Sequence, residues 1–177
     1  MRVNEQIGKG MSTFDVLIRA YAFNRQRTLG VLDQIEQMPE PQAVLGWRPG
    51  VGRAHIAWQL THVGVTEELF ATERLAPDKP GSFTDLWPRF RGGSTPDDNI
   101  PSTAEIRQVL TDGRKHLLDT LSRFGDEHLG DIPEALKQRN LTMLDVLHIL
   151  SWHEAHHQGQ SHITLNLYKA NHGMNVR

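Results

Sequence analysis

The chain contains no cysteine among its 177 residues. This absence excludes disulfide bonds, thiolate metal sites and cysteine nucleophiles, and it suits a reducing compartment. Long apolar runs are also missing, since no stretch approaches the roughly 20 residues that a membrane-spanning helix needs. The polar N-terminal stretch MRVNEQIGKG lacks the apolar core of a signal peptide. We therefore expect a cytoplasmic protein with no membrane partner.

A strong charge of either sign is absent as well. The 19 Lys and Arg residues nearly balance the 21 Asp and Glu residues, which gives a formal net charge of −2. Bulk electrostatics therefore favour neither nucleic acid nor an anionic membrane as a partner. The hydrophobic content of 38% and the charged content of 23% are typical of a globular protein. The length predicts a single domain over residues 1–177.

Alternating runs of β-branched residues are nearly absent, so we expect no β-sheet. Apolar residues at helical spacing instead predict four helices, over residues 13–38, 53–75, 103–124 and 143–170. Candidate N-caps for three of them are Ser12 or Thr13, Ser102 or Thr103, and Thr142 or Asn140. Four helices of similar length without an internal repeat favour an all-α protein, a four-helix bundle.

The second and third helices are separated by residues 77–102, which are rich in Gly, Pro, Asp and Ser. A loop of this length inside a domain is usually functional or mobile. Its aromatic residues, Phe83, Trp87 and Phe90, could form a lid or could fix the loop to the bundle.

Five of the ten histidines fall between Leu147 and Ile163. His153 and His157 are four residues apart, so a helix places them on one face, within a stripe whose polar stretch His-His-Gln-Thr has apolar residues on either side. Two inward-facing imidazoles need partners, and a metal ion would satisfy both. His148 and His162 point away from this stripe, and His156 is intermediate, within reach of a dimer partner or of the residues that support a metal.

The segment His153-Glu154-Ala155-His156-His157 also matches H-E-x-x-H, the zinc-protease helix. One protease class needs an acidic ligand downstream, but no Asp or Glu follows Glu154. Another class needs a glycine and a third histidine at the positions of Gln160 and Ile163. We therefore reject the protease interpretation.

A third ligand must then come from upstream, where the second predicted helix offers His55 and His62. The two are seven residues apart and share a face, so spacing alone does not choose between them. Position favours His62, because it lies in the middle of the helix where facing helices pack closely, whereas His55 lies near the start.

This pattern resembles the DinB/YfiT-like superfamily of small metal-binding four-helix bundles. The resemblance covers residues 12–170 and rests on His62 in WQLTHV, on His153 and His157 in HEAHHQGQ, and on the segment LGWRPGVGRAHIAW. It implies a homodimer in which these three histidines bind one divalent metal ion, zinc or nickel. Characterised members include transferases that use low-molecular-weight thiols and maleylpyruvate isomerases that depend on mycothiol.

We therefore expect a metal-dependent enzyme that acts on a small molecule, with thiol S-transfer or hydrolysis as the reaction. Gln160, His156 and Thr66 are candidates for supporting the metal or contacting substrate. Glu67, Glu68 and Glu154 are candidate bases, although we expect most of them to be solvated, and no catalytic residue is assigned.

Two alternatives remain open. One is a non-catalytic, metal-stabilised protein for stress-related binding or dimerisation, which a fourth ligand such as His55 or His156 would favour. The other is a bundle without metal, whose histidines pair with carboxylates.

Overall fold

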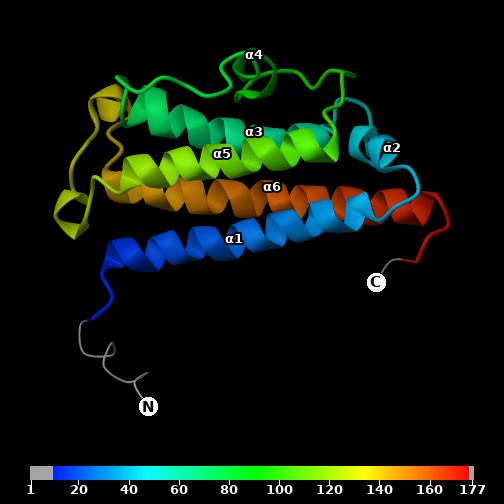
Figure 1. The fold of residues 1–177 in the computed structure, drawn as a ribbon, viewed down its shortest axis with the longest axis horizontal. Coiled ribbons are helices and arrows are strands. Elements are labelled where there is room, and N and C mark those ends of the chain that lie inside the picture. The colour runs from blue at the N-terminus through cyan, green and yellow to red at the C-terminus, as the bar shows by residue number, and fades with distance from the viewer. Residues whose placement is uncertain (1–9, 176–177) are drawn as a thin grey trace.

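The computed structural model describes residues 10–175, and over this range it contains helices and loops but no β-strand. Four long helices lie side by side (Figure 1): α1 (Thr13–Glu36), α3 (Ile56–Leu69), α5 (Thr103–Leu121) and α6 (Met143–Asn171). The all-α prediction is confirmed. Within the described residues, no helix combines the length and apolar character needed to cross a membrane.

Shorter elements join the long helices. A π-helical segment, η1 (Phe70–Arg74), continues α3, and two 3₁₀ segments, η2 (Asp126–His128) and η3 (Glu134–Arg139), lie between α5 and α6. The sequence did not predict the short helices α2 (Pro41–Gly46) and α4 (Trp87–Phe90). Both are shorter than two turns, too short for a periodic apolar pattern to be recognised.

Side-chain caps set where the long helices begin. Ser12 caps α1, while Ser102 with Glu105, and Thr142 with Asp145, form capping boxes at α5 and α6. The start of α3 differs from the predicted residue 53. Here the His55 side chain accepts a hydrogen bond from the backbone N–H of Trp58, so the helix begins at Ile56.

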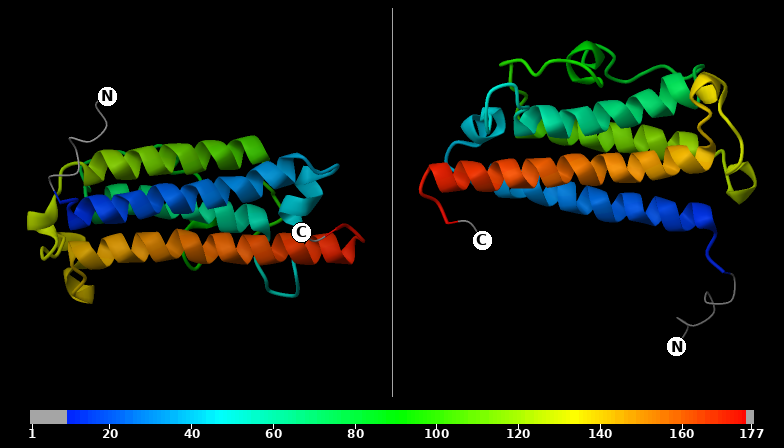
Figure 2. Two further views of the ribbon diagram at one scale, coloured as in Figure 1. Left: turned by 90° about the horizontal axis from the view of Figure 1, so that it is seen from below. Right: turned by 180° about the vertical axis from the view of Figure 1, so that it is seen from behind.

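The helix directions explain the long loop. In Figures 1 and 2, α1 and α6 run in one direction, and α3 and α5 run in the other. Because α3 and α5 are successive long helices that run in the same direction, the chain must return along the length of the bundle before α5 begins. Residues 77–102 make this return over the outer side of α3 and carry α4 (Figure 1).

The backbones of α3 and α5 are in contact where both helices carry glycine. A Cβ atom on Gly113 would lie 2.4 Å from the backbone oxygen of Gly64, and one on Gly64 would lie 2.7 Å from that of Val109. No side chain fits such a backbone contact, so these two glycines set the distance between the helices.

The core is apolar toward both ends of the bundle and polar between them. One apolar cluster includes Leu32, Leu60 and Leu165, and a second includes Tyr21, Leu117 and Leu147. A smaller third cluster packs Phe90 of α4 against α3 and α5. The polar middle section contains the charged side chains of two arginines and two glutamates, none more than 11% exposed, together with the three histidines of interest. Any chemistry inside the bundle therefore has to be sought in this middle section.

Candidate metal centre

Three histidines from two helices meet in the polar middle section. One nitrogen each from His62 on α3 and from His153 and His157 on α6 can be chosen so that all three lie within 4.8 Å of one another. His62 Nε2 and His153 Nε2 are 3.0 Å apart. His62 is buried, and the other two are partly buried. The structure thus brings together the three residues that the sequence analysis selected.

The ring of His62 is held in one orientation. Its Nδ1–H donates a hydrogen bond to the backbone carbonyl of Phe90 at 2.6 Å, and the ring stacks on Trp58 with centroids 4.6 Å apart. A carbonyl oxygen only accepts, so the proton must be on Nδ1. His62 Nε2 is therefore left with a free lone pair, as a metal ligand requires.

His157 is oriented in the same way by a side chain. Its Nδ1 is hydrogen-bonded to the Oε1 atom of Gln59, which lies one turn before His62 on α3. This partner fixes the proton on Nδ1 and leaves Nε2 free. Two of the three rings thus have their second nitrogen held by a protein acceptor, an arrangement typical of histidine metal ligands.

All three imidazoles are held in the neutral, ligating form. Burial, together with the neighbouring histidines, lowers the pKa of His153 to about 2 and that of His157 to about 3. Burial also lowers the pKa of His62, although the Phe90 carbonyl opposes the change. Among the described residues, none of the three rings hydrogen-bonds to a carboxylate, which speaks against the carboxylate-paired alternative.

The donor set fits a divalent metal ion. Metal–nitrogen bonds of about 2.0–2.1 Å place two nitrogens of one tetrahedral ion about 3.3–3.4 Å apart, and the His62–His153 separation of 3.0 Å is close to this distance. Imidazole nitrogens suit zinc and nickel among other ions. Three histidines also leave coordination positions for a further molecule, as in catalytic zinc sites.

The other candidate ligands lie elsewhere. Both ring nitrogens of His55 are in use, since Nδ1 accepts from Trp58 and Nε2 lies 2.9 Å from the Asp97 carbonyl. His156 is exposed and stacks on Trp152, with centroids 4.9 Å apart. The outward direction expected for His148 and His162 agrees with their exposure.

Gln160 and Thr66 are both partly buried near the cluster. Gln160 lies one turn after His157, and its Oε1 atom is buried without a hydrogen-bond partner among the described residues. Thr66 lies one turn after His62, and no side-chain hydrogen bond of its own is found in residues 10–175.

A closed ring of buried charges lies next to the histidines, and the sequence analysis missed it. Arg25 binds Glu154 at 2.7 Å and Glu67 at 2.8 Å, and Arg114 contacts the same two carboxylates. The ring joins one residue from each long helix. Burial alone would lower the pKa of Arg25, but the two carboxylates outweigh burial and raise it.

The expectation that most of the three glutamates are solvated is wrong. Glu67, Glu68 and Glu154 are 3%, 0% and 1% exposed. The first and third belong to the charge ring, and Glu68 bonds His116 at 2.9 Å and the backbone N–H of Ser82. The sequence did contain a signal that Arg25 points inward. It follows the core residue Tyr21 by one helical turn, so the two share a face of the helix.

The long loop is fixed to the bundle through its own backbone. The carbonyls at the end of α4 accept hydrogen bonds, that of Phe90 from His62 and that of Arg89 from Trp58 Nε1 at 3.1 Å. Phe90 is buried, with Val65 and Val109 in its cluster. Of the two roles considered for the loop aromatics, these contacts favour fixing the loop.

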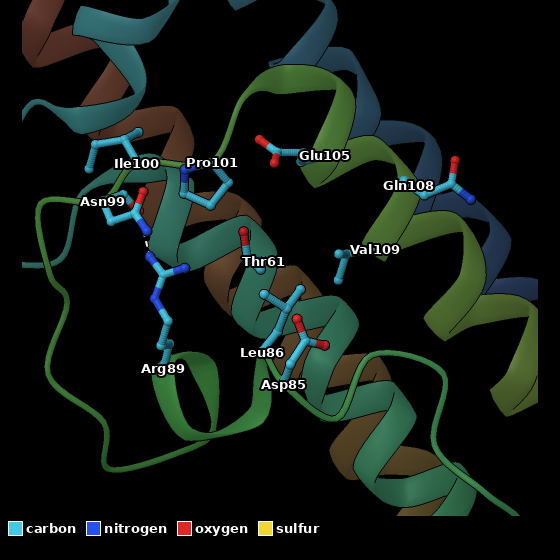
Figure 3. Close-up of a pocket in the computed structure, with 10 residues that line it drawn as sticks. All are labelled: Thr61, Asp85, Leu86, Arg89, Asn99, Ile100, Pro101, Glu105, Gln108 and Val109. Atoms are coloured by element: carbon cyan, nitrogen blue, oxygen red, sulfur yellow. Dashed lines mark hydrogen bonds between the residues drawn. The ribbon is translucent and has the colours of Figure 1, made fainter.

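A cavity of 340 Å³ lies between this loop, α3 and α5 (Figure 3). Neither a histidine of the cluster nor a residue that hydrogen-bonds one of them lines it. Two of its charged groups are already paired, since Arg89 makes two hydrogen bonds of 2.9 Å to Asp97, and Glu105 caps α5 through Ser102. The cavity is therefore separate from the candidate metal centre.

Comparison with known proteins gives one match. The sequence model of the DinB superfamily matches residues 20–161, which include all three histidines. Searches of curated proteins and of solved structures returned no match. Because the matched range spans most of the sequence, the chain belongs to the DinB superfamily.

Proposed function

We propose that this protein is a metal-dependent enzyme in which His62, His153 and His157 bind one divalent ion, zinc or nickel. The observation that carries the proposal is the convergence of three neutral imidazoles from two helices, two of them oriented by acceptors on the second ring nitrogen. A metal bound there would lower the pKa of a bound water or thiol toward neutrality.

The reaction would take place on a small molecule, by thiol S-transfer or by hydrolysis. An open three-histidine set supports an enzyme over a purely structural site, because structural zinc sites normally have four protein ligands. His55 does not supply a fourth ligand, because hydrogen bonds occupy both of its ring nitrogens. A low-molecular-weight thiol as co-substrate would suit a chain without cysteine.

The same proposal includes a homodimer. Support comes from large apolar side chains left exposed on α1 and α6, with Phe23 at 64% and Trp152 at 63% exposure.

Metal analysis tests the site. We expect about one zinc or nickel ion per chain in protein purified without a histidine tag. His62→Ala and His153→Ala should lose the metal, and His148→Ala, which changes an exposed histidine on the same helix, should keep it. Full metal content in the first two variants would overturn the proposal.

A further inference from the structure

A second cavity, of 310 Å³, lies beside the candidate metal centre. It is bounded by the turn at residues 49–54 and by the second half of α6, with Gln59 of α3 between them. Gln59 is also the hydrogen-bond partner of His157, so the cavity begins one hydrogen bond away from a proposed metal ligand. Its volume is at the lower end of the range for small-molecule sites.

Gln160 lines the cavity and carries an acceptor without a donor. Its Oε1 atom is buried beneath the cavity surface, and no hydrogen bond to it is found among the described residues. Buried acceptors are normally satisfied, so Gln160 would gain a hydrogen bond if its side chain turned toward an N–H or O–H group of a ligand.

The outer wall carries one charge and an apolar surface. Arg53 is the single charged residue among the described residues that line the cavity, and no ion pair engages it within residues 10–175, where the nearby Asp98 pairs with Arg48 instead. A guanidinium group matches the geometry of carboxylates and phosphates. Ile163 and Leu167 line the same cavity and are 61% and 44% exposed, which provides apolar area for a ligand to cover.

We propose that this cavity binds the substrate of the metal centre, and that the substrate is a small molecule with three parts. An oxyanion head group, carboxylate or phosphate, pairs with Arg53. An apolar body packs on Ile163 and Leu167, and a hydrogen-bond donor faces Gln160. The assignment to a substrate rests on the proposed function, whereas the binding chemistry rests on the cavity itself.

The test uses three probes that differ in the head group: 6-hydroxyhexanoate, 6-hydroxyhexyl phosphate and hexane-1,6-diol. Each is titrated into zinc-loaded protein at neutral pH, and the NMR signals of the Gln59 and Gln160 side-chain amides are followed. We expect at least one anionic probe to bind about tenfold more tightly than the diol, because a charge-assisted hydrogen bond is stronger than a neutral one. The tighter of the two anions identifies the head group.

Arg53→Gln should bring the three dissociation constants to within about twofold of one another. Arg123→Gln is the matched control, since Arg123 is exposed, unpaired among the described residues, and located in the turn that follows α5. It should preserve the preference for the anion. Equal affinities in the wild type, or an unchanged preference in Arg53→Gln, would overturn the inference.

The role of Gln160 is tested with hexanoate, which lacks the hydroxyl donor of 6-hydroxyhexanoate. The wild type should prefer 6-hydroxyhexanoate over hexanoate, and Gln160→Met should lose that preference. If the preference persists in Gln160→Met, the role of Gln160 is overturned.

Metal content measured on the same samples separates the two proposals. Anion selectivity without stoichiometric metal would overturn the proposed function and the substrate assignment, while metal without selectivity would overturn the inference alone.

Discussion

The charge ring and the histidine cluster occupy the same section of the bundle but differ in how their groups are satisfied. Both join α3 to α6, and Glu154 directly follows His153 in sequence. The ring holds two positive and two negative side chains, and each contacts both opposite charges. The cluster brings three groups of one kind together, with His62 Nε2 facing His153 Nε2.

This difference separates a structural polar network from a binding site. The ring is complete without any added group, because its charges cancel and its hydrogen bonds are internal. In the cluster, burial and mutual repulsion both oppose protonation, so the lone pairs remain directed at a common space. A cation is the group that satisfies several converging lone pairs at once. We therefore expect stability to depend on the ring and metal affinity on the cluster.

The largest expected effect is loss of stability when the ring is opened. Glu154→Gln would leave two buried arginines facing one carboxylate, and removal of one partner from a buried ion pair costs about 3–5 kcal/mol. Urea unfolding of the zinc-free protein measures this change. Arg107→Gln is the control, because its pairs with Asp33 and Glu36 are largely exposed and should contribute under about 1 kcal/mol. Equal losses in the two variants would contradict a structural role for the ring.

The second effect is loss of metal affinity when a ligand is removed. His153→Ala should weaken zinc binding by about 100-fold or more, since only two of the three imidazoles remain. Competition with a chromophoric chelator measures the dissociation constant. His162→Ala, on the exposed part of the same helix, should bind zinc like the wild type. A loss of less than about threefold in His153→Ala would remove His153 from the cluster's function.

A smaller effect is expected at the residue that orients His157. Gln59→Leu removes the acceptor for Nδ1, and loss of such a partner typically lowers metal affinity by about 10–100-fold. The same chelator competition measures it. Gln108→Leu, an exposed glutamine on α5, serves as the control. If Gln59→Leu binds zinc like its control, the hydrogen bond does not tune the metal site.

The sequence predicts the features that depend on a single helix. Capping residues such as Ser102 and Thr142 act within one turn, so their chemistry can be read locally. The pairing of His153 with His157 follows from helical spacing, and the preference for His62 over His55 followed from its place in the helix.

Features that depend on several helices escaped prediction. A charged residue such as Arg25 reads as solvated until the partners from three other helices are known. The support of His62 comes from the carbonyl of Phe90, and a backbone atom has no sequence signature. The order of the helices also had to come from the structure, because a long loop can join either parallel or antiparallel neighbours.

The smallest expected effect is a pH dependence of stability that arises from the cluster. In the unfolded chain, His153 and His157 have pKa values near 6.5, whereas in the folded zinc-free protein they are about 2 and about 3. Below pH 6.5 the unfolded state therefore binds protons that the folded state does not, and stability falls from pH 6.5 toward pH 3. Because both rings are partly exposed, we expect a loss of only about 1 kcal/mol between pH 6.5 and 5.5. Urea unfolding across this range should show a shallower slope in His157→Gln than in His148→Gln, whose substitution lies on the exposed face of α6. Identical slopes in the two variants would mean that the imidazoles of the cluster take up protons in the folded state. The cluster would then be charged and poorly suited to bind a cation.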